Sequence, residues 1–364
     1  MSKTTPDLTD VSAAWLPAPV MAEAEASEAV EAPRTPGHPR VDAPAFGLLI
    51  VLALLFVVVW LAPPMVLLQQ SDRLFPVALH TIMETGAVVV AFLIFAVSWH
   101  SHMAARSGGL VVLGLGFLAV GLLDVAHMLS YKGMPDFVTP ASPEKAIDFW
   151  LMARYVSAVT LLTVALWSRQ WRFAPAWRPP LLVLVLAGVF VAGALRLSWA
   201  PEIFPRTFIE GQGLTAFKIA AEYGIVALLL LSAGLFLRDW RRSAGYDAGA
   251  LFTAAGVTVL CELCFTLYSN VNGIFSLLGH VYKVIAYGYL YRAVVVAGVR
   301  APYEDLRREV GIRRDAEQRI EYLAYHDALT GLPNRRLAAD RFMRDVAHAQ
   351  RTGRKVAVIF IDLD

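Results

Sequence analysis

The sequence predicts an all-α polytopic membrane bundle of about eight transmembrane helices, followed by an exposed helix and the start of a small α/β unit. Of the 364 residues, 57% are hydrophobic and 17% charged, and the mean hydropathy is +0.55, outside the range of soluble domains. Apolar runs of about 20 residues, enough to cross roughly 30 Å of hydrocarbon, recur along the chain. The formal net charge of +2 is nearly balanced and by itself argues neither for nor against a nucleic-acid partner. Among partners we expect the lipid bilayer and a second copy of the chain, and no nucleic acid.

The first element, residues 1–43, is predicted to be a disordered cytoplasmic tail. It is rich in Ala, Glu and Pro, and it lacks the apolar run beside a basic start that marks a signal peptide.

The membrane unit, residues 44–298, contains eight apolar runs separated by polar, turn-rich segments. The predicted spans are Ala45–Leu61, Pro76–Trp99, Gly109–Tyr131, Ile147–Ser168, Pro180–Trp199, Ala216–Leu237, Gly249–Asn270 and Ile274–Ala297.

Basic residues in the short loops set the predicted orientation, because Lys and Arg accumulate on the cytoplasmic side. One side carries Arg106, Arg169, Arg172, Arg178, Arg238, Arg241 and Arg242, and the other carries Arg73, Lys132, Lys145 and Arg206. An even number of spans then puts both termini in the cytoplasm, and we expect a multi-pass protein of the bacterial inner membrane.

Residues 299–325 are predicted to form a signalling helix that pairs as a parallel coiled coil. Its seam positions alternate at three and four residues: Tyr303, Leu306, Val310, Arg313, Glu317, Ile320 and Ala324. Two of the seven are charged, so the homodimer seam would be weak and able to shift. An ordinary exposed connector helix is the alternative.

Residues 326–364 begin with the string DALTGLPNRR at Asp327–Arg336. Gly331 and Pro333 predict a turn, and Asn334 predicts the N-cap of an amphipathic helix. Val356–Ile361 is predicted to be a buried strand that leads into the carboxylates Asp362 and Asp364.

This helix, turn, helix and strand with a DxD pair resembles the start of a GGDEF diguanylate cyclase domain. The resemblance implies that Asp362 helps hold Mg²⁺ on GTP phosphates, a role that suits a carboxylate at a strand end, while Asp364 is structural. It also implies a dimer that joins two GTP molecules into cyclic di-GMP. The remaining family residues would follow Asp364, so we expect a piece of a longer cyclase, inactive by itself.

Three alternatives stay open for this tail. A degenerate domain would bind cyclic di-GMP or GTP without making product, and a phosphodiesterase domain could follow. His326 beside Asp327 also admits a histidine-kinase phospho-acceptor, although the chain turns into a strand where a kinase needs a second long helix.

Ionisable residues inside the predicted spans are costly and mark functional sites. They are His80, Glu84, Asp124, His127, Arg154, Lys218, Glu222, Glu262, His280 and Lys283. Each lies roughly 6 to 13 Å from the periplasmic end of its span at a 1.5 Å rise per residue, so we expect one polar layer. It could be a pocket for a small polar ligand, a pH-sensitive histidine switch, a metal or haem site on His80, His127 and His280, or a packing network of ion pairs. Cys261 and Cys264 are expected to be structural.

The stretch from about His80 to Glu309 resembles the third class of membrane-associated sensor (MASE) domains. The resemblance rests on HTIME from His80, GLLDVAHMLSYKGM from Gly121, ARY from Ala153, EGQGLTAFKIAAEY from Glu210, CELCFTLY from Cys261 and GHVYKVIAYGYLYRA from Gly279. It implies an integral sensor with no catalytic residues of its own. A transporter with a regulatory tail is the rival, but no broken helix pair repeats in two halves.

Overall fold

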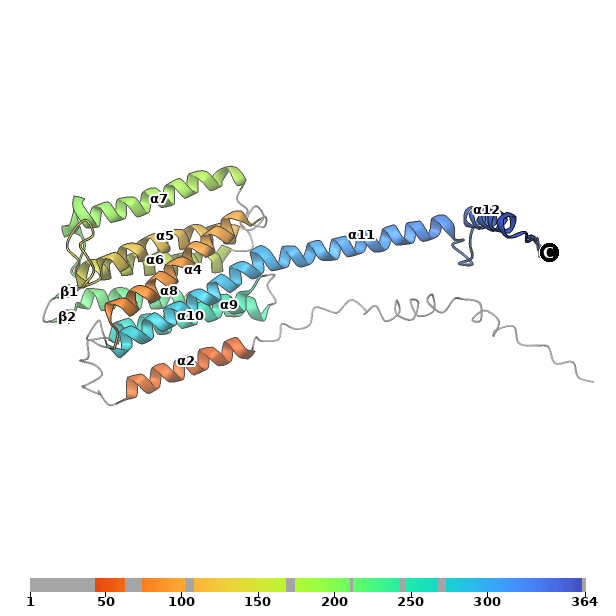
Figure 1. Cartoon of the computed structure of the whole chain (residues 1–364). Helices are drawn as coiled ribbons and strands as arrows, with labels where there is room; N and C mark the ends of the chain where they lie inside the picture. Colours follow the sequence, from red (N-terminus) through yellow and green to blue (C-terminus); the bar gives the residue numbers. More distant parts are fainter. Residues whose placement is uncertain are drawn as a thin grey trace, which may run out of the picture.

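The computed structural model shows a helical bundle from which one long helix projects (Figure 1). It describes residues 43–62, 74–101, 108–167, 174–209, 212–242, 246–267 and 273–361. Residues 1–42 of the predicted tail, Asp362 and Asp364 lie outside these residues, and Ala43 is the first residue of a helix.

All eight predicted spans are helices, with ends close to those expected. They are α2 (Ala43–Leu61), α4 (Val77–His100), α5 (Gly108–Ser130), α6 (Pro143–Trp167), α7 (Arg178–Ala194), α8 (Ala216–Arg241), α9 (Ala248–Leu267) and α10 (Ile274–Val295). Seven helices among the described residues are long and apolar enough to cross a membrane, and α2, with its apolar stretch Ala45–Leu61, is shorter.

Consecutive helices run in opposite directions, so the start of α2 and the exit of α10 lie at one end of the bundle (Figure 1). The opposite end carries the shorter elements. They are η4 (Leu195–Trp199), η5 (Pro201–Ile203) and the antiparallel pair β1 (Phe208–Ile209) and β2 (Gly213–Leu214), in which Phe208 faces Leu214. A further short turn, η3 (Pro175–Trp177), precedes α7.

Small residues bring the helices of the core into close contact. An added Cβ at Gly116 of α5 would lie 2.2 Å from Thr160 Oγ1 of α6, and one at Gly279 of α10 would lie 2.6 Å from the Phe265 ring. Membrane helices associate through such close approaches because lipid supplies no hydrophobic force between them. The core is therefore tightly packed around α5 and α10.

Helix α7 is the exception, because none of its residues is buried. Leu181, Leu182 and Val185 pack against Val111 and Leu115 of α5. An apolar pocket of about 570 Å³ lies between α7 and helices α5, α6 and α8. This helix is therefore only loosely attached to the bundle.

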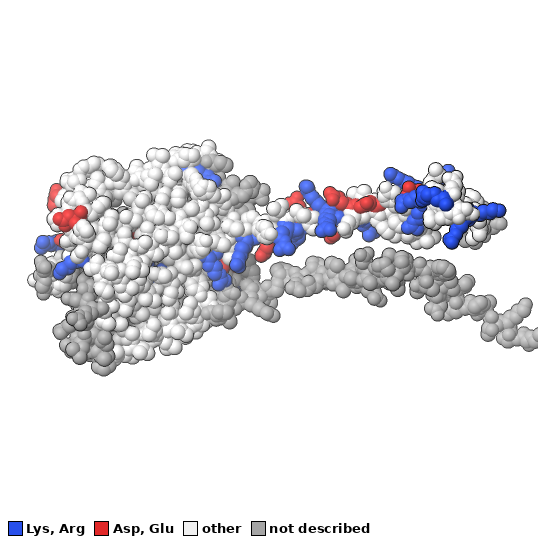
Figure 2. Space-filling model, in the orientation of Figure 1, with Lys and Arg blue, Asp and Glu red and all other residues white. Residues whose placement is uncertain are grey.

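Helix α10 leaves the bundle without a break. The π-turn η6 (Val296–Arg300) joins it to α11 (Ala301–Tyr325), giving a 52-residue helical segment, Ile274–Tyr325, which spans about 78 Å at 1.5 Å per residue. The visible face of the bundle is almost free of charge, whereas charges line α11 (Figure 2). The predicted seam is exposed, with Leu306 at 57% and Val310 at 56%.

The chain after α11 turns at Gly331, whose φ is +68°, and continues as α12 (Arg335–Thr352). Asn334 is the N-cap of α12, as predicted: its side chain accepts hydrogen bonds from the Arg336 and Leu337 amides at 3.0 and 3.2 Å. The prediction of a buried strand at Val356–Ile361 was wrong. These residues form no strand and are exposed, with Phe360 at 93%. A strand needs a hydrogen-bonded partner, and none of the described residues lies beside it.

Candidate functional site

The ten ionisable residues predicted within the spans are almost fully buried, and each lies in the half of its helix that is farther from α11. Seven of them form one connected cluster. The other three, Lys218, Glu222 and Glu262, lie beside it on α8 and α9.

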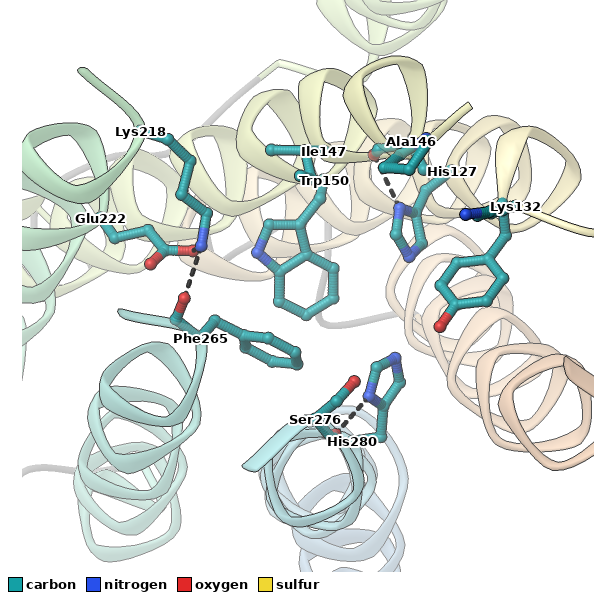
Figure 3. A pocket seen from close by; sticks show the side chains of 12 residues that line it. His127, Lys132, Ala146, Ile147, Trp150, Lys218, Glu222, Phe265, Ser276 and His280 are labelled. Atoms are coloured by element: carbon teal, nitrogen blue, oxygen red, sulfur yellow. Dashed lines mark hydrogen bonds and ion pairs between the residues drawn. The ribbon is translucent and has the colours of Figure 1, made fainter. Parts of the chain in front are cut away.

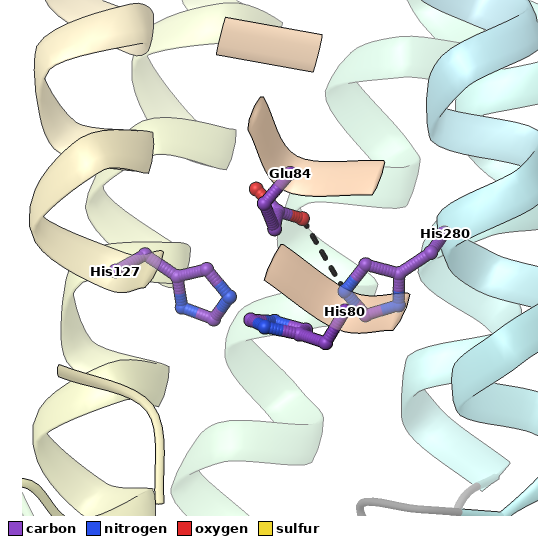
Figure 4. A group of neighbouring side chains, drawn as sticks. All are labelled: His80, Glu84, His127 and His280. Carbon is purple, nitrogen blue, oxygen red and sulfur yellow. Dashed lines mark ion pairs between the residues drawn. The ribbon is translucent and has the colours of Figure 1, made fainter. Parts of the chain in front are cut away.

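The cluster begins with three histidines and a carboxylate from three helices (Figure 4). His80 and Glu84 come from α4, His127 from α5 and His280 from α10, and one potential ligand atom from each lies within 4.8 Å of those from the others. His80 and Glu84 share a helix face because they are four residues apart. We call these four residues the His₃Glu cluster.

Two of the imidazoles are held by backbone carbonyls. His127 Nδ1 lies 2.7 Å from the Ala146 oxygen, and His280 Nδ1 lies 2.7 Å from the Ser276 oxygen. A carbonyl only accepts, so each Nδ1 carries a proton and, in the neutral ring, Nε2 has a free lone pair. Both Nε2 atoms therefore face the cluster as potential ligands.

Several polar atoms of the cluster have no hydrogen-bond partner among the described residues. They are both ring nitrogens of His80, Nε2 of His127 and of His280, and Oε1 of Glu84. His280 Nε2 lies 3.3 Å from Glu84 Oε1, an ion-pair distance if the ring is protonated. Buried polar groups are rarely left in this state.

An ion-pair chain continues from Glu84 towards the middle of the bundle. Lys283 donates to Glu84 Oε2 at 2.7 Å and lies 3.1 Å from Asp124 Oδ2. Arg154 donates to Asp124 Oδ1 at 2.9 Å and to the Tyr287 hydroxyl at 2.7 Å. The Tyr287 hydroxyl in turn donates to Asp124 Oδ2 at 2.9 Å. Asp124 is thus fully partnered.

A second group lies on α8 and α9. Lys218 Nζ lies 2.6 Å from Glu222 Oε1 and donates to the Phe265 carbonyl. Glu262 is fully buried and interacts electrostatically with Arg154 and Glu222, but neither of its oxygens has a hydrogen-bond partner among the described residues. With every group ionised, four carboxylates face three cations, so the ten residues lack one positive charge before the histidines are counted.

A small pocket connects the two groups (Figure 3). It has about 40 Å³ of free space and is lined by His127, His280, Lys218, Glu222 and Trp150 among others. The loop residue Lys132 and Pro143, at the start of α6, line it as well. The space suits a few water molecules or an ion, and it is far below the several hundred Å³ of pockets for larger ligands, so haem does not fit.

Three aromatic residues of the site, Tyr131, Trp150 and Tyr287, were not predicted. Tyr131 is buried and stacks on His80 at 3.7 Å between ring centroids. Trp150 has Arg154 at 4.6 Å and Lys283 at 4.7 Å from its ring, positions suited to cation–π contacts. Helical spacing could have indicated two of them, since Trp150 precedes Arg154 by four residues and Tyr287 follows Lys283 by four.

A separate ion pair, also not predicted, attaches α7 to the bundle. Arg196 of η4 pairs with Asp148 of α6, and Thr207 donates to the other Asp148 oxygen at 2.9 Å. Cys261 and Cys264 are free and buried, and Cys261 Sγ contacts the Gly279 carbonyl at 3.2 Å, in agreement with a structural role.

The DALTGLPNRR turn forms a compact unit at the end of α11. Asp327 Oδ1 accepts hydrogen bonds from the Thr330 hydroxyl and amide, both at 2.9 Å, and from the Leu329 amide at 3.2 Å. These bonds lower the pKa of Asp327. His326 stacks on Tyr322 at 4.0 Å. Through this turn, α12 is fixed to the end of α11.

Comparisons with known families agree with this architecture. The structure is a helical membrane bundle with a buried polar cluster and one long helix that projects from it. The model of the MASE3 membrane-associated sensor domain matches residues 74–302, more than half of the chain, and the chain belongs to this family. The model described as the diguanylate cyclase GGDEF domain matches residues 324–364.

One curated protein shares a short stretch with the chain. An uncharacterized signaling protein of Caulobacter vibrioides is 46% identical over 57 residues, which are 16% of this chain and 7% of that protein. The chain thus spans a small part of that relative. No solved structure matches the chain. Together these matches indicate a membrane-associated sensor domain followed by the start of a GGDEF domain.

Proposed function

We propose that the protein is an inner-membrane sensor that controls cyclic di-GMP synthesis from two GTP by a C-terminal GGDEF domain. The observation that carries the proposal is the continuous helical segment Ile274–Tyr325. It holds His280, Lys283 and Tyr287 inside the bundle, and its other end meets the DALTGLPNRR turn. A change at the polar cluster can therefore reach the GGDEF start through one rigid element.

The enzymatic half of the proposal rests on the family resemblance. Mg²⁺ held in part by Asp362 would neutralise charge on the GTP phosphates during phosphoryl transfer. Two GTP sites must face each other for cyclic di-GMP to form, so two copies would pair through the α11 seam, with the bundles side by side in the bilayer.

The test is cyclic di-GMP measured in cells that carry the complete protein. Asp362→Ala should abolish the product. Glu84→Gln, Asp124→Asn and Arg154→Met should each shift the output several-fold, because they break the network that holds α10. Asp239→Asn is the matched control: Asp239 is also buried, but it lies at the other end of α8, where the Tyr246 hydroxyl donates to it at 2.9 Å.

The possible results separate the two halves of the proposal. Product that persists in Asp362→Ala contradicts the cyclase role and favours a degenerate GGDEF receptor. Output that responds equally to all four membrane variants, the Asp239 control included, contradicts a specific sensing role for the cluster.

The orientation is proposed from the loop charges. Reporter enzymes fused after His100, at the end of α4, and in the loop after Ser130, at the end of α5, should report opposite sides, with His100 cytoplasmic. The reverse result would place the polar cluster on the cytoplasmic side of the membrane.

A further inference from the structure

The His₃Glu cluster has the composition of a metal site. Imidazole is a preferred ligand of Zn²⁺, Fe²⁺, Cu²⁺ and Ni²⁺, whereas Mg²⁺ and Ca²⁺ prefer oxygen ligands throughout. Three histidines and one carboxylate from α4, α5 and α10 meet at one point, with potential ligand atoms within 4.8 Å of one another. All four side chains are at least nine-tenths buried.

The spacing of these atoms is close to that of a filled site. Metal–ligand distances of about 2.0 to 2.2 Å in a tetrahedron put the ligand atoms about 3.3 to 3.6 Å apart. The 3.3 Å between His280 Nε2 and Glu84 Oε1 already agrees with this range. The wider pairs need movements of about 1 Å, which small side-chain rotations supply.

The surroundings of the cluster orient it for coordination. Ligand histidines usually donate their second ring N–H to a carbonyl or carboxylate, which fixes the tautomer. The Ala146 and Ser276 carbonyls have this relation to His127 and His280, each at 2.7 Å. The free Nε2 lone pairs then point at the centre of the cluster (Figure 4).

A packing role does not account for these atoms. A buried polar group without a partner costs about 1 to 3 kcal/mol, and the cluster contains several such atoms among the described residues. A protonated His280 would pair with Glu84 but would leave the nitrogens of His80 and His127 Nε2 unpaired. One cation at the centre satisfies one nitrogen of each imidazole and Glu84 together.

We therefore propose that His80, Glu84, His127 and His280 bind one divalent first-row transition-metal ion of the Zn²⁺ class. The pocket beside His127 and His280 is the access route for the ion, since it reaches the loop residue Lys132. The ten buried residues include four carboxylates and only three permanent cations, and this deficit of one positive charge favours binding of a cation at the His₃Glu cluster.

The inference deepens the proposed function by naming the sensor's ligand, and it rests on that function only for the signalling consequence. Glu84 uses Oε2 for Lys283 and would use Oε1 for the metal. Lys283 and the ligand His280 lie on the same face of α10, three residues apart. Binding of the ion would therefore change the forces on the helix that continues into α11.

The test is metal binding by the purified chain in lipid nanodiscs, prepared with a cleavable tag free of histidine and stripped with a chelator. We expect one equivalent of Zn²⁺ per chain, with a matching rise in melting temperature. His80→Gln and His280→Gln should weaken binding about 100-fold or more. His100→Gln is the matched control, because His100 lies on the same helix α4 as His80 but is exposed at its other end.

A second variant, His127→Cys, tested with Co²⁺, keeps the test decisive if the glutamine variants fail to fold. Co²⁺ should give the visible absorption of a four-coordinate site in the wild type. His127→Cys should retain binding and add a thiolate-to-Co²⁺ band in the near ultraviolet. Glu84→Gln should lose affinity, whereas Asp239→Asn, at the far end of α8 and outside the ten residues, should not.

Wild-type chain that takes up no Zn²⁺ at micromolar concentrations overturns the proposal. The same is true if His80→Gln, His280→Gln and His100→Gln bind alike, or if the His127→Cys spectrum lacks the new band. None of these measurements depends on cyclic di-GMP, so their failure is distinct from failure of the proposed function.

Discussion

The bundle and the projecting helix α11 differ in which side chains they bury: the bundle buries charged groups, whereas α11 exposes apolar ones. In the bundle, Arg154, Lys283 and Asp124 are almost fully buried and each has an ion-pair partner a few ångströms away. Along α11, the apolar Leu306, Val310 and Ile320 are all more than half exposed. The bundle thus satisfies its charges internally, whereas α11 has an apolar stripe that a second chain could cover.

The largest expected effect is from Arg154→Met in the bundle. The variant removes the cation that Asp124 holds at 2.9 Å, and breaking a buried pair costs about 3 to 5 kcal/mol. Arg206→Met, at an ion pair with Glu144 in which the Arg206 side chain is 75% exposed, should cost less than about 1 kcal/mol. Thermal unfolding of both variants in the same detergent measures the difference, and equal losses would contradict a special role for the cluster.

Close packing in the bundle predicts the next effect. Gly116→Ala should destabilise by about 1 to 3 kcal/mol, because its Cβ would lie 2.2 Å from Thr160 Oγ1. Gly311→Ala on α11 meets nothing within 4 Å and should be neutral or slightly stabilising, since Ala favours helix over Gly. The two melting temperatures should therefore move in different directions or by clearly different amounts.

The apolar stripe of α11 predicts a weaker effect that concerns association. Leu306→Asp should reduce the affinity between copies at least tenfold, about 1.4 kcal/mol, without changing the melting of the bundle. Ile312→Asp is the control, because Ile312 is 65% exposed but lies outside the predicted seam. Energy transfer between labelled copies in a bilayer measures both, and an equal loss in the two variants would argue against the seam.

The smallest effect is expected at the turn after α11. Its hydrogen bonds lower the pKa of Asp327, so the charged carboxylate stabilises the turn above its unfolded pKa of about 4, and this contribution is lost as the pH falls through the lower folded value. Asp327→Asn should speed hydrogen exchange of the Leu329 and Thr330 amides at pH 7. The difference from wild type should shrink in acid, and a constant difference would show that charge has no part in it.

Much of the bundle could be predicted because membrane helices are marked by the length of apolar runs. The ten buried ionisable residues were predicted from the same signal, since a charge inside such a run is conspicuous. Helical spacing then placed His80 with Glu84 and Asp124 with His127 on shared faces. The structure added which faces meet, namely α4, α5 and α10 at the His₃Glu cluster.

Other features depend on contacts between distant segments that spacing does not reveal. The Asp148–Arg196 pair joins α6 to η4 through two residues that are 48 positions apart in the sequence and lie near the ends of their spans. Tyr131 lies at the end of α5 and resembles an ordinary interfacial tyrosine. The predicted strand Val356–Ile361 has the right residues, but strand formation depends on a neighbour, whereas the helix α12 needs only its own backbone and the Asn334 cap.

The π-turn η6 between α10 and α11 has a consequence for how such sensors are joined to their outputs. A π-turn contains one residue more than a regular turn, and one residue rotates everything after it by about 100° around the helix axis. The direction in which the α11 stripe points is therefore set at Val296–Arg300, independently of the residues that line the His₃Glu cluster. Gain or loss of a single residue there would re-aim the output helix while leaving the membrane bundle untouched.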